Sequence, residues 1–400
     1  MQGGGIMKKL ILVLLVLVSI SFAITVSEKT GIVILPAKVG NGWNMDEADY
    51  LISLLEEKAL SLGRFRVYSR NDLDAIVKER NLSELGIVEK TFEAGKILGA
   101  KYAILLTLTE LTSQYEDNGY TASLRLSLKL YDLSSGELLA AKTFDDSTYV
   151  EEETAQKAIN SLLELVSEKI WLTLREFFKV EAYVKSVEDG KVYLAGLEPN
   201  IVKKGFIFKI ETSDGDVAYV EVIGIDRKEN LVVTKFKYGG TPEVFDPAIE
   251  YPISGTYGGF SIGMYSGKIS IGISGFQNNL FVDAGIILAS EMGYVPWYTT
   301  VGGLLKFAEM GQISLSGFGG LQLLGIYNTN SDSNDSFLNV FGINAGVQIK
   351  YEFEPKNGIF INAGYTMLFL GDVVQNIYNI LFGIDNTSFV QFNIGYFMAF

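Results

Sequence analysis

The sequence of 400 residues contains no cysteine and no histidine. Without thiolate or imidazole side chains, the chain can form no Ser-His-Asp triad, no cysteine nucleophile and no zinc site of the usual His and Cys ligands. The lack of cysteine also excludes a lipid-modified N-terminal cysteine. We therefore predict that the protein is not an enzyme, and we assign no catalytic, cofactor-binding or metal-binding residue.

Positive charge is also scarce. The chain has 33 Lys and Arg against 47 Asp and Glu, which gives a net charge of −14. Nucleic acids and anionic lipid headgroups are bound through clustered Lys and Arg. We therefore expect no nucleic-acid partner, and anionic headgroups are disfavoured.

The first residues have the pattern of an export signal. From Met7, Lys8 and Lys9 precede an uncharged apolar run over 10–20, and a small-x-small motif ends at Ala23. This pattern predicts a secretory signal peptide over 1–23 with its real start at Met7 and cleavage after Ala23. A retained membrane helix is the alternative, but the run is shorter than the roughly 20 residues that span a bilayer.

Residues 24–178 alternate between strand-like and helix-like patterns, which is typical of a layered α/β domain. The run 32–35 predicts a short buried strand, and 124–132 with 137–144 predict a hairpin. The remaining expectations are helices over 46–62, 72–80, about 91–99 and 151–178, with strands over 65–68 and 102–109.

Three segments of this domain carry a family resemblance, namely 65–76, 93–104 and 130–138. Together they resemble the periplasmic domain of the curli secretion channel family, and also related domains in flagellar assembly proteins of the T type. The resemblance covers about 30–175, and it implies the family's fold and a tendency to assemble into rings. The chain departs from curli channels in two ways, since it lacks the lipidated cysteine and shows no strands inserted into this domain for a shared barrel.

Residues 180–245 change to short strands separated by turns, which predicts a small β-domain. The segments 190–194 and 202–208 resemble the small C-terminal β-domain of those flagellar assembly proteins. A generic SH3-like or OB-like module is the alternative. Prolines 242, 247 and 252 follow closely, so we predict a stiff linker over 246–254.

Charge nearly disappears from residues 255–400, which contain only four lysines and no arginine. Over 341–353 every odd position is apolar, while the even positions are mostly glycine or polar. Such alternation predicts an outer-membrane β-barrel with an apolar outside and a polar interior. Similar patterns at 259–265, 268–274, 280–288, 297–307, 312–325, 359–370 and 388–400 raise the expected number of strands to about eight. A secreted β-sandwich is the soluble alternative.

The last strand ends in a pattern that resembles the signal that such barrels present to their insertion machinery. Its apolar residues alternate up to the terminus, and we predict a barrel insertion signal made by Phe392, Ile394, Tyr396, Met398 and Phe400. Aromatic residues near strand ends are expected at the membrane interfaces: Tyr257, Trp297, Tyr298, Tyr327 and Tyr351. The polar loop 328–335 is expected to be an exposed turn outside the cell. A calcium site in this loop is an alternative, although its Asp residues do not have the spacing of an EF-hand.

An eight-stranded barrel is narrow and is usually filled by its own side chains, so anchoring is its natural role. The sequence thus predicts a multidomain protein of the outer membrane that holds its N-terminal domains in the periplasm for appendage or envelope assembly. The expected partners are outer-membrane lipid, the barrel insertion machinery and an unidentified periplasmic protein, with a homo-oligomer left open. The alternatives are an oligomeric outer-membrane secretion channel component and a soluble periplasmic assembly factor.

Overall fold

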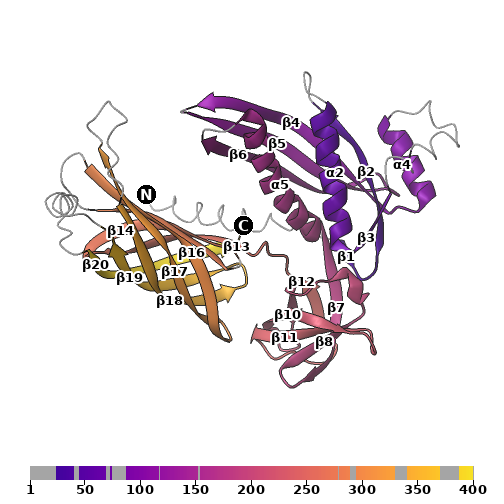
Figure 1. Cartoon of the computed structure of the whole chain (residues 1–400). Coiled ribbons are helices and arrows are strands. Elements are labelled where there is room, and N and C mark those ends of the chain that lie inside the picture. Colours follow the sequence, from indigo (N-terminus) through magenta and orange to yellow (C-terminus); the bar gives the residue numbers. More distant parts are fainter. Residues whose placement is uncertain are drawn as a thin grey trace, which may run out of the picture. The chain divides into compact units, whose positions relative to one another are not determined.

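The computed structural model describes residues 24–39, 45–68, 73, 87–116, 118–151, 154–277, 279–288, 294–328, 340–369 and 387–399 (Figure 1). The chain divides into two compact units. The first holds most of the residues up to 252, and the second holds 253–400 together with 214–220 and 236–241. The predicted cleavage site at Ala23 and most of the predicted helix over 72–80 lie outside the described residues.

The first unit opens with a mixed sheet in the order β3-β2-β4-β5-β6. Strand β2 is parallel to β3 and β4, while β4, β5 and β6 follow one another as antiparallel hairpins. The strands are β2 (Thr30–Val39), β3 (Phe65–Tyr68), β4 (Tyr102–Glu116), β5 (Gly119–Asp132) and β6 (Leu138–Glu151).

Helices cover both faces of this sheet, which explains the continuous apolar run Ile32–Leu35 in β2. Val33 and Leu35 pack in one core with Ala94 of α4 (Ile87–Leu98). Alternate residues point to the other face, where α2 (Met45–Leu62) and α5 (Ala155–Phe177) contact the strands. The Thr154 side chain caps α5 by accepting a hydrogen bond from the Lys157 amide. No helix in the described ranges is both long enough and apolar enough to span a bilayer.

Six strands after α5 close into a small barrel. Their order is β7-β12-β9-β10-β11-β8, and pairing of β8 with β7 completes the ring. The N-terminal strand β1 (Ile24–Val26) adds to it, parallel to the start of β7. A short 3-10 helix, η2 (Pro199–Ile201), follows β8. The strands are β7 (Phe178–Glu188), β8 (Lys191–Ala195), β9 (Ile207–Glu211), β10 (Val217–Asp226), β11 (Leu231–Gly239) and β12 (Pro247–Glu250).

The prediction of a linker over 246–254 is wrong for residues 247–250. These residues form β12, which pairs with β7 on one side and β9 on the other. Proline is tolerated at the first residue of a strand because its missing N–H costs no ladder bond there. Ala248 and Glu250 are buried, so β12 is an integral strand of the six-stranded barrel.

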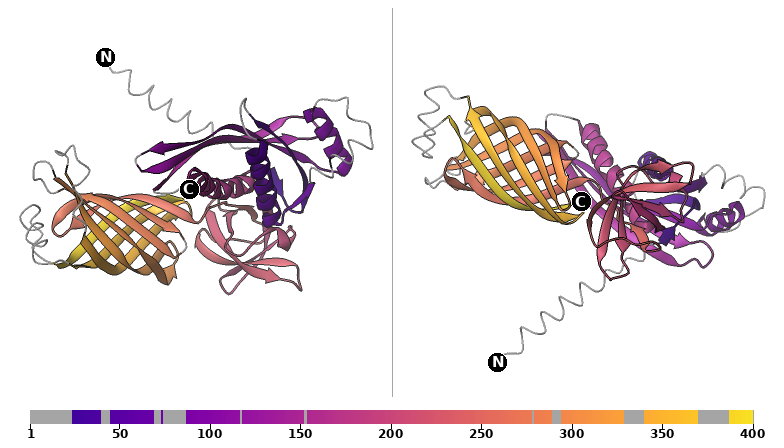
Figure 2. Two further views of the ribbon diagram at one scale, coloured as in Figure 1. Left: turned by 45° about the horizontal axis from the view of Figure 1, so that its top comes forward. Right: turned by 90° about the horizontal axis from the view of Figure 1, so that it is seen from below.

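The second unit is built on an eight-stranded closed barrel whose strands pair in chain order, with β20 returning to β13. The predicted strand number is confirmed, and the glycine-rich stretch after 312 forms one strand, β17. Figure 2 shows the strands tilted around the barrel. They are β13 (Thr256–Tyr265), β14 (Lys268–Gln277), β15 (Leu280–Ile287), β16 (Tyr294–Met310), β17 (Ile313–Asn328), β18 (Val340–Glu354), β19 (Asn357–Leu368) and β20 (Ser388–Ala399).

Candidate functional site

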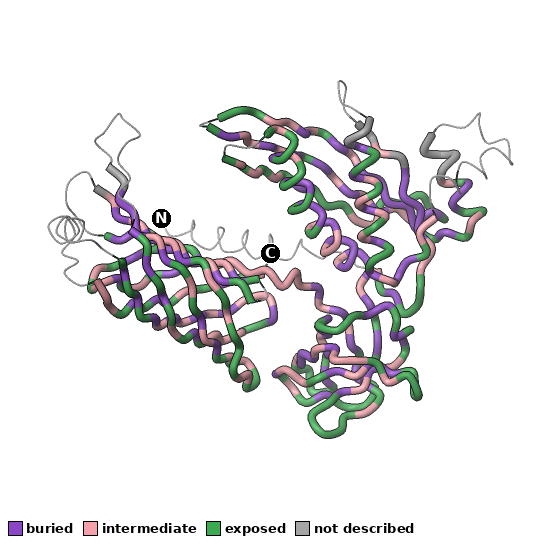
Figure 3. The backbone as a smooth tube through the Cα atoms, viewed as in Figure 1, coloured by how far each residue is buried: buried purple, intermediate pink, exposed green. Residues whose placement is uncertain are grey.

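The outer face of the eight-stranded barrel is apolar. Along β18, Phe341, Ile343, Val347 and Ile349 are exposed, and Gly342, Asn344 and Gln348 are buried. Figure 3 shows exposed and buried positions alternating along the barrel strands. The same alternation runs through the other strands. The exposed side chains include Phe260, Ile262, Met264, Ile269, Ile271, Ile273, Leu305, Phe307, Met310, Leu321, Tyr365 and Val390.

The last strand contributes to the same apolar surface. Phe392, Ile394, Tyr396 and Met398 of β20 all lie on the outside. Their inward neighbours include Gln391, Asn393 and Phe397, which are buried. Phe400 lies outside the described residues, and the role of these residues as an insertion signal stays a prediction.

Aromatic side chains fill both ends of the barrel interior. Near the β14–β15 turn, buried rings pack into one cluster made of Phe276, Phe281, Phe318, Phe360 and Phe397. Toward the other end, Tyr265 stacks on Tyr298 at 5.0 Å and meets Phe389 edge-on at 4.6 Å. The expectation that Tyr298 faces a membrane interface is therefore wrong, since its ring is buried inside the barrel. Tyr257 likewise packs against the inner Phe397 ring. Tyr257 and Tyr298 both stand at positions where the alternation along their strands directs the side chain into the barrel.

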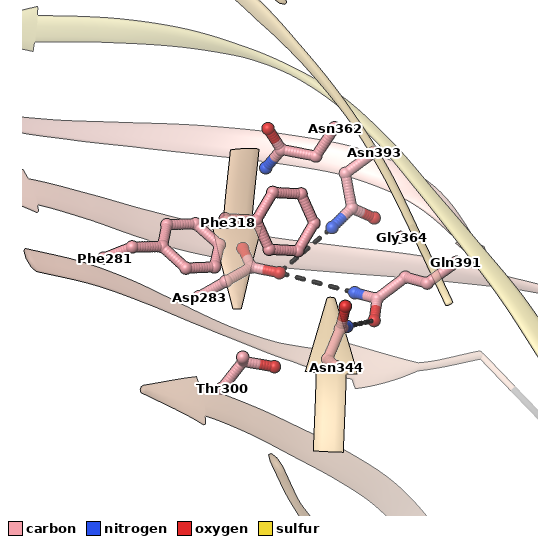
Figure 4. A pocket seen from close by; sticks show the side chains of 9 residues that line it. All are labelled: Phe281, Asp283, Thr300, Phe318, Asn344, Asn362, Gly364, Gln391 and Asn393. Carbon is pink, nitrogen blue, oxygen red and sulfur yellow. Dashed lines mark hydrogen bonds between the residues drawn. The ribbon is translucent and has the colours of Figure 1, made fainter. Parts of the chain in front are cut away.

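Between the aromatic layers lies a polar layer centred on Asp283 (Figure 4). Its carboxylate accepts hydrogen bonds from the Ser274 hydroxyl at 2.6 Å, the Asn393 amide at 3.0 Å and the Gln391 amide at 3.4 Å. Asn344 donates in turn to Gln391 at 2.8 Å. The network joins strands β14, β15, β18 and β20 across the interior. Three donors offset part of the cost of burying a carboxylate.

The polar layer encloses a cavity of about 10 Å³. That space holds about one water molecule. Thr300 Oγ1 and Asn362 Nδ2 line the cavity and have no protein partner among the described residues, as expected where a water completes the bonding. The lining residues are Phe281, Asp283, Thr300, Phe318, Asn344, Asn362, Gly364, Gln391 and Asn393. The interior is thus filled by side chains and offers no path for a polypeptide.

A second buried polar cluster joins the two parts of the first unit. Glu250 at the end of β12 receives Arg64 at 2.6 Å and Arg175 of α5 at 2.7 Å, with all three side chains buried. Both guanidinium groups also lie over the Phe206 ring, at 5.6 and 4.0 Å. Burial lowers the pKa of Arg175, and the Glu250 carboxylate opposes that shift. The cluster fixes the mixed sheet domain against the six-stranded barrel.

Sequence reasoning singled out none of these buried charges. A lone acid in the apolar strand Leu280–Ile287 was the signal for Asp283, because a charge there needs internal partners. Arg64 and Arg175 gave no signal, since each lies near other charged residues, and Glu250 lies between two prolines in a segment that shows no strand period. The loop 328–335, which the sequence offers as an alternative calcium site, lies almost entirely outside the described residues. Within the described ranges, no group of three or more acidic, His or Cys side chains could hold a metal ion.

Comparison with known proteins shows which family the first domain resembles. Residues 18–169 match the family model described as "Curli production assembly/transport component CsgG". This part of the chain is therefore CsgG-like, as its three segments predicted. The likeness to flagellar assembly proteins stays a prediction. No curated protein matches the chain.

Solved structures show weaker likeness. The LpoB C-terminal domain from Salmonella enterica is 16% identical over 32% of this chain and 87% of its own, with a TM-score of 0.24. The PelC dodecamer from Paraburkholderia phytofirmans is 12% identical, with coverages of 36% and 89% and a TM-score of 0.25. The N-terminal β-barrel domain of Pseudomonas aeruginosa OprF is 16% identical, with coverages of 36% and 96% and a TM-score of 0.26. Similarity at this level carries no inference about function.

Proposed function

We propose that this protein, with its CsgG-like first domain, is an anchor of the bacterial outer membrane. Its eight-stranded barrel sits in the lipid and holds the first unit at the periplasmic side, where that unit serves assembly of an appendage or of the envelope. One observation carries the proposal: a closed barrel exposes an almost unbroken apolar surface around a polar and aromatic interior.

Water is a poor solvent for such a surface. Soluble monomers rarely expose apolar patches larger than a few hundred Å², whereas the exposed Phe, Ile, Leu, Met and Val side chains here come from all eight strands. A transmembrane barrel needs this arrangement, because its lipid-facing and inward positions alternate. The soluble periplasmic factor is therefore the weaker alternative.

The first unit supports an assembly role over an enzymatic one. Its CsgG-like part belongs to a class of proteins described as assembly and transport components. Its most buried charges form two ion pairs, Arg64 and Arg175 both binding Glu250, so they hold structure together. The partner that this unit serves is a periplasmic protein or a second copy of the chain.

A secretion channel component is the second candidate, favoured by the transport description of the matching family. The filled interior of the eight-stranded barrel argues against export through a single barrel. Any pore would have to form between several chains. The mass of the detergent-solubilised protein discriminates the two: a ring of many copies favours the channel, and a monomer or dimer favours the anchor.

Membrane insertion is tested with a charge placed on the outer face. Val347 lies midway along β18 and is 47% exposed, and Val187 of the six-stranded barrel is 42% exposed. Arginine near the bilayer midplane costs a barrel about 2–4 kcal/mol, so Val347→Arg should sharply reduce the folded, heat-modifiable form in urea-washed outer membranes. Val187→Arg should leave it unchanged. A wild-type protein that washes off with urea, without heat-modifiable gel migration, would reject the anchor.

A further inference from the structure

The turn between β11 and β12 exposes a large aromatic side chain in a strained conformation. Phe245 is 75% exposed, and its φ of 77° lies in the left-handed region. The other non-glycine residues with positive φ in the described ranges are Asn, Asp and Ser, which turns commonly use. For a bulky residue such as phenylalanine, the conformation is a genuine outlier. Val244 beside it is also exposed.

The surrounding contacts hold this turn firmly. The Phe245 amide donates to the Val184 carbonyl at 2.8 Å, and the Val184 amide donates to the Asp246 carbonyl at 2.9 Å. The buried Asp246 carboxylate accepts the Glu243 amide at 2.7 Å. Tyr183 stacks on the Phe245 ring with centroids 6.2 Å apart. The aromatic side chain is therefore presented to the outside in one fixed position.

Stability of the six-stranded barrel does not account for phenylalanine here. The strained backbone costs free energy that glycine or asparagine would avoid. Stacking on Tyr183 offsets that cost only in part, because most of the Phe245 surface stays in water. A strained and exposed aromatic residue of this kind indicates a site whose side chain is stabilised by contact with a partner outside the six-stranded barrel.

The position in the chain indicates what covers the turn. Strand β12 ends at Glu250, and β13 of the lipid-facing barrel begins at Thr256. At roughly 3.3–3.6 Å per residue, Phe245 cannot lie farther than about 40 Å from the start of β13. The tether therefore lets the turn reach the bilayer surface, where peripheral proteins bury Trp, Phe and Leu side chains at the boundary of headgroups and acyl chains.

We propose that Val244 and Phe245, backed by Tyr183, form an interfacial membrane contact of the six-stranded barrel. The contact inserts an apolar tip into the zwitterionic headgroup layer next to the anchor. It draws on apolar burial, because the net charge of −14 disfavours anionic headgroups. This inference rests on the proposed membrane insertion of the eight-stranded barrel.

The absence of native cysteine makes the test clean, since one introduced cysteine carries the only label. Val244→Cys, Ile271→Cys on the outside of β14 and Leu138→Cys on β6 each receive an environment-sensitive fluorophore. The full-length proteins are reconstituted into phosphatidylcholine vesicles that contain lipids with a nitroxide in the headgroup or in the acyl chain. Val244→Cys is also made together with Phe245→Ser.

We expect the headgroup nitroxide to quench the label at 244 at least twofold more than the label at 138. The added Phe245→Ser change should remove most of that difference. The acyl-chain nitroxide should quench the label at 271. Quenching at 271 with none at 244, or quenching at 244 that survives Phe245→Ser, overturns the interfacial contact alone. A label at 271 that is not quenched rejects membrane insertion itself, and the contact with it.

Discussion

The guanidinium of Arg64 binds the carboxylate of Glu250 at 2.6 Å across a separation of 186 residues, with both side chains fully buried. Arg64 stands between α2 and β3, whereas Glu250 ends the last strand of the six-stranded barrel. The same carboxylate accepts the backbone amide of Val180 at 3.2 Å, and Arg64 also donates to the Phe178 carbonyl at 2.8 Å. A single carboxylate therefore connects a helix end, α5 and two strands of the first unit.

Removing that carboxylate should destabilise the first unit strongly. Glu250→Gln removes the carboxylate charge that the two buried guanidinium groups share, and loss of one partner of a buried pair costs about 3–5 kcal/mol. The amides of β7 from Lys179 to Val184 should then exchange hydrogen faster in the full-length protein, and this is followed by mass spectrometry. Glu181→Gln, at an exposed position of β7, is the matched control and should leave exchange unchanged.

Replacing all three charges tests whether the cluster acts through charge balance. The triple variant Arg64→Met, Arg175→Met, Glu250→Leu contains no buried charge at this place, so it should lose less stability than Glu250→Gln alone. A triple variant that is less stable than the single variant would show that the hydrogen bonds, and not the unpaired charges, dominate.

Asp283 should stabilise the barrel through the donors that it satisfies. Asp283→Ala leaves the Ser274 hydroxyl and the amides of Asn393 and Gln391 without their acceptor, at a cost of about 1–3 kcal/mol for each buried group left unpaired. The temperature at which the folded gel band converts to the unfolded band should fall. Gln277→Ala, at an exposed position at the end of β14, should leave it unchanged. A conversion temperature equal to wild type in Asp283→Ala would contradict the network.

Two phenylalanines near the C-terminus should act at different stages. Phe397 is buried in the aromatic cluster, so Phe397→Ala should lower the stability of the folded barrel by about 3–5 kcal/mol. Deletion of Phe400, the last residue of the predicted insertion signal, should slow insertion in cells while the inserted barrel keeps its stability. Pulse-chase labelling gives the insertion rate, and heat conversion of the inserted fraction gives the stability. Equal insertion rates with and without Phe400 would reject the signal.

The turn between β5 and β6 should make stability depend on pH. The Ser134 hydroxyl, with the backbone amides of Ser135 and Ser134, donates to the Asp132 carboxylate and lowers its pKa below 3.8. A lowered folded-state pKa means that the ionised carboxylate stabilises the fold above the unfolded pKa, and that this contribution is lost as pH falls through the folded pKa. Asp132→Asn should therefore be less stable than wild type at pH 7.

That difference should narrow as the pH is lowered below 3.8, the ordinary value for the aspartate. The stability of wild type and of Asp132→Asn is followed by hydrogen exchange of the β5 and β6 amides at several pH values. Glu137→Gln in the same turn is the control, because its side chain is exposed. A difference that stays constant down to low pH would show that the stabilisation does not depend on ionisation of Asp132.

How far the sequence predicts this molecule depends on the range of the interactions. The eight barrel strands could be located because alternation is local, and the residues of β18 illustrate it position by position. The same alternation of inward and outward positions places Tyr298 inside the barrel. Its aromatic ring near a strand end had instead favoured a position at the membrane interface. Strand β12 was missed because four residues with a proline carry no period, and its identity depends on distant partners in β7 and β9. The Glu250 cluster was missed for the same reason.

The position of Glu250 in the chain also determines the order in which parts of the protein can fold. The carboxylate that pairs with Arg64 and Arg175 belongs to the last strand before the eight-stranded barrel, so both ion pairs form only once that strand is in place. While the chain is still emerging from a translocation pore, Arg64 and Arg175 lack the Glu250 carboxylate, so burying their guanidinium groups costs free energy. We therefore expect the packing around these two arginines to form only after residue 250 has crossed, just before the eight strands of the larger barrel follow.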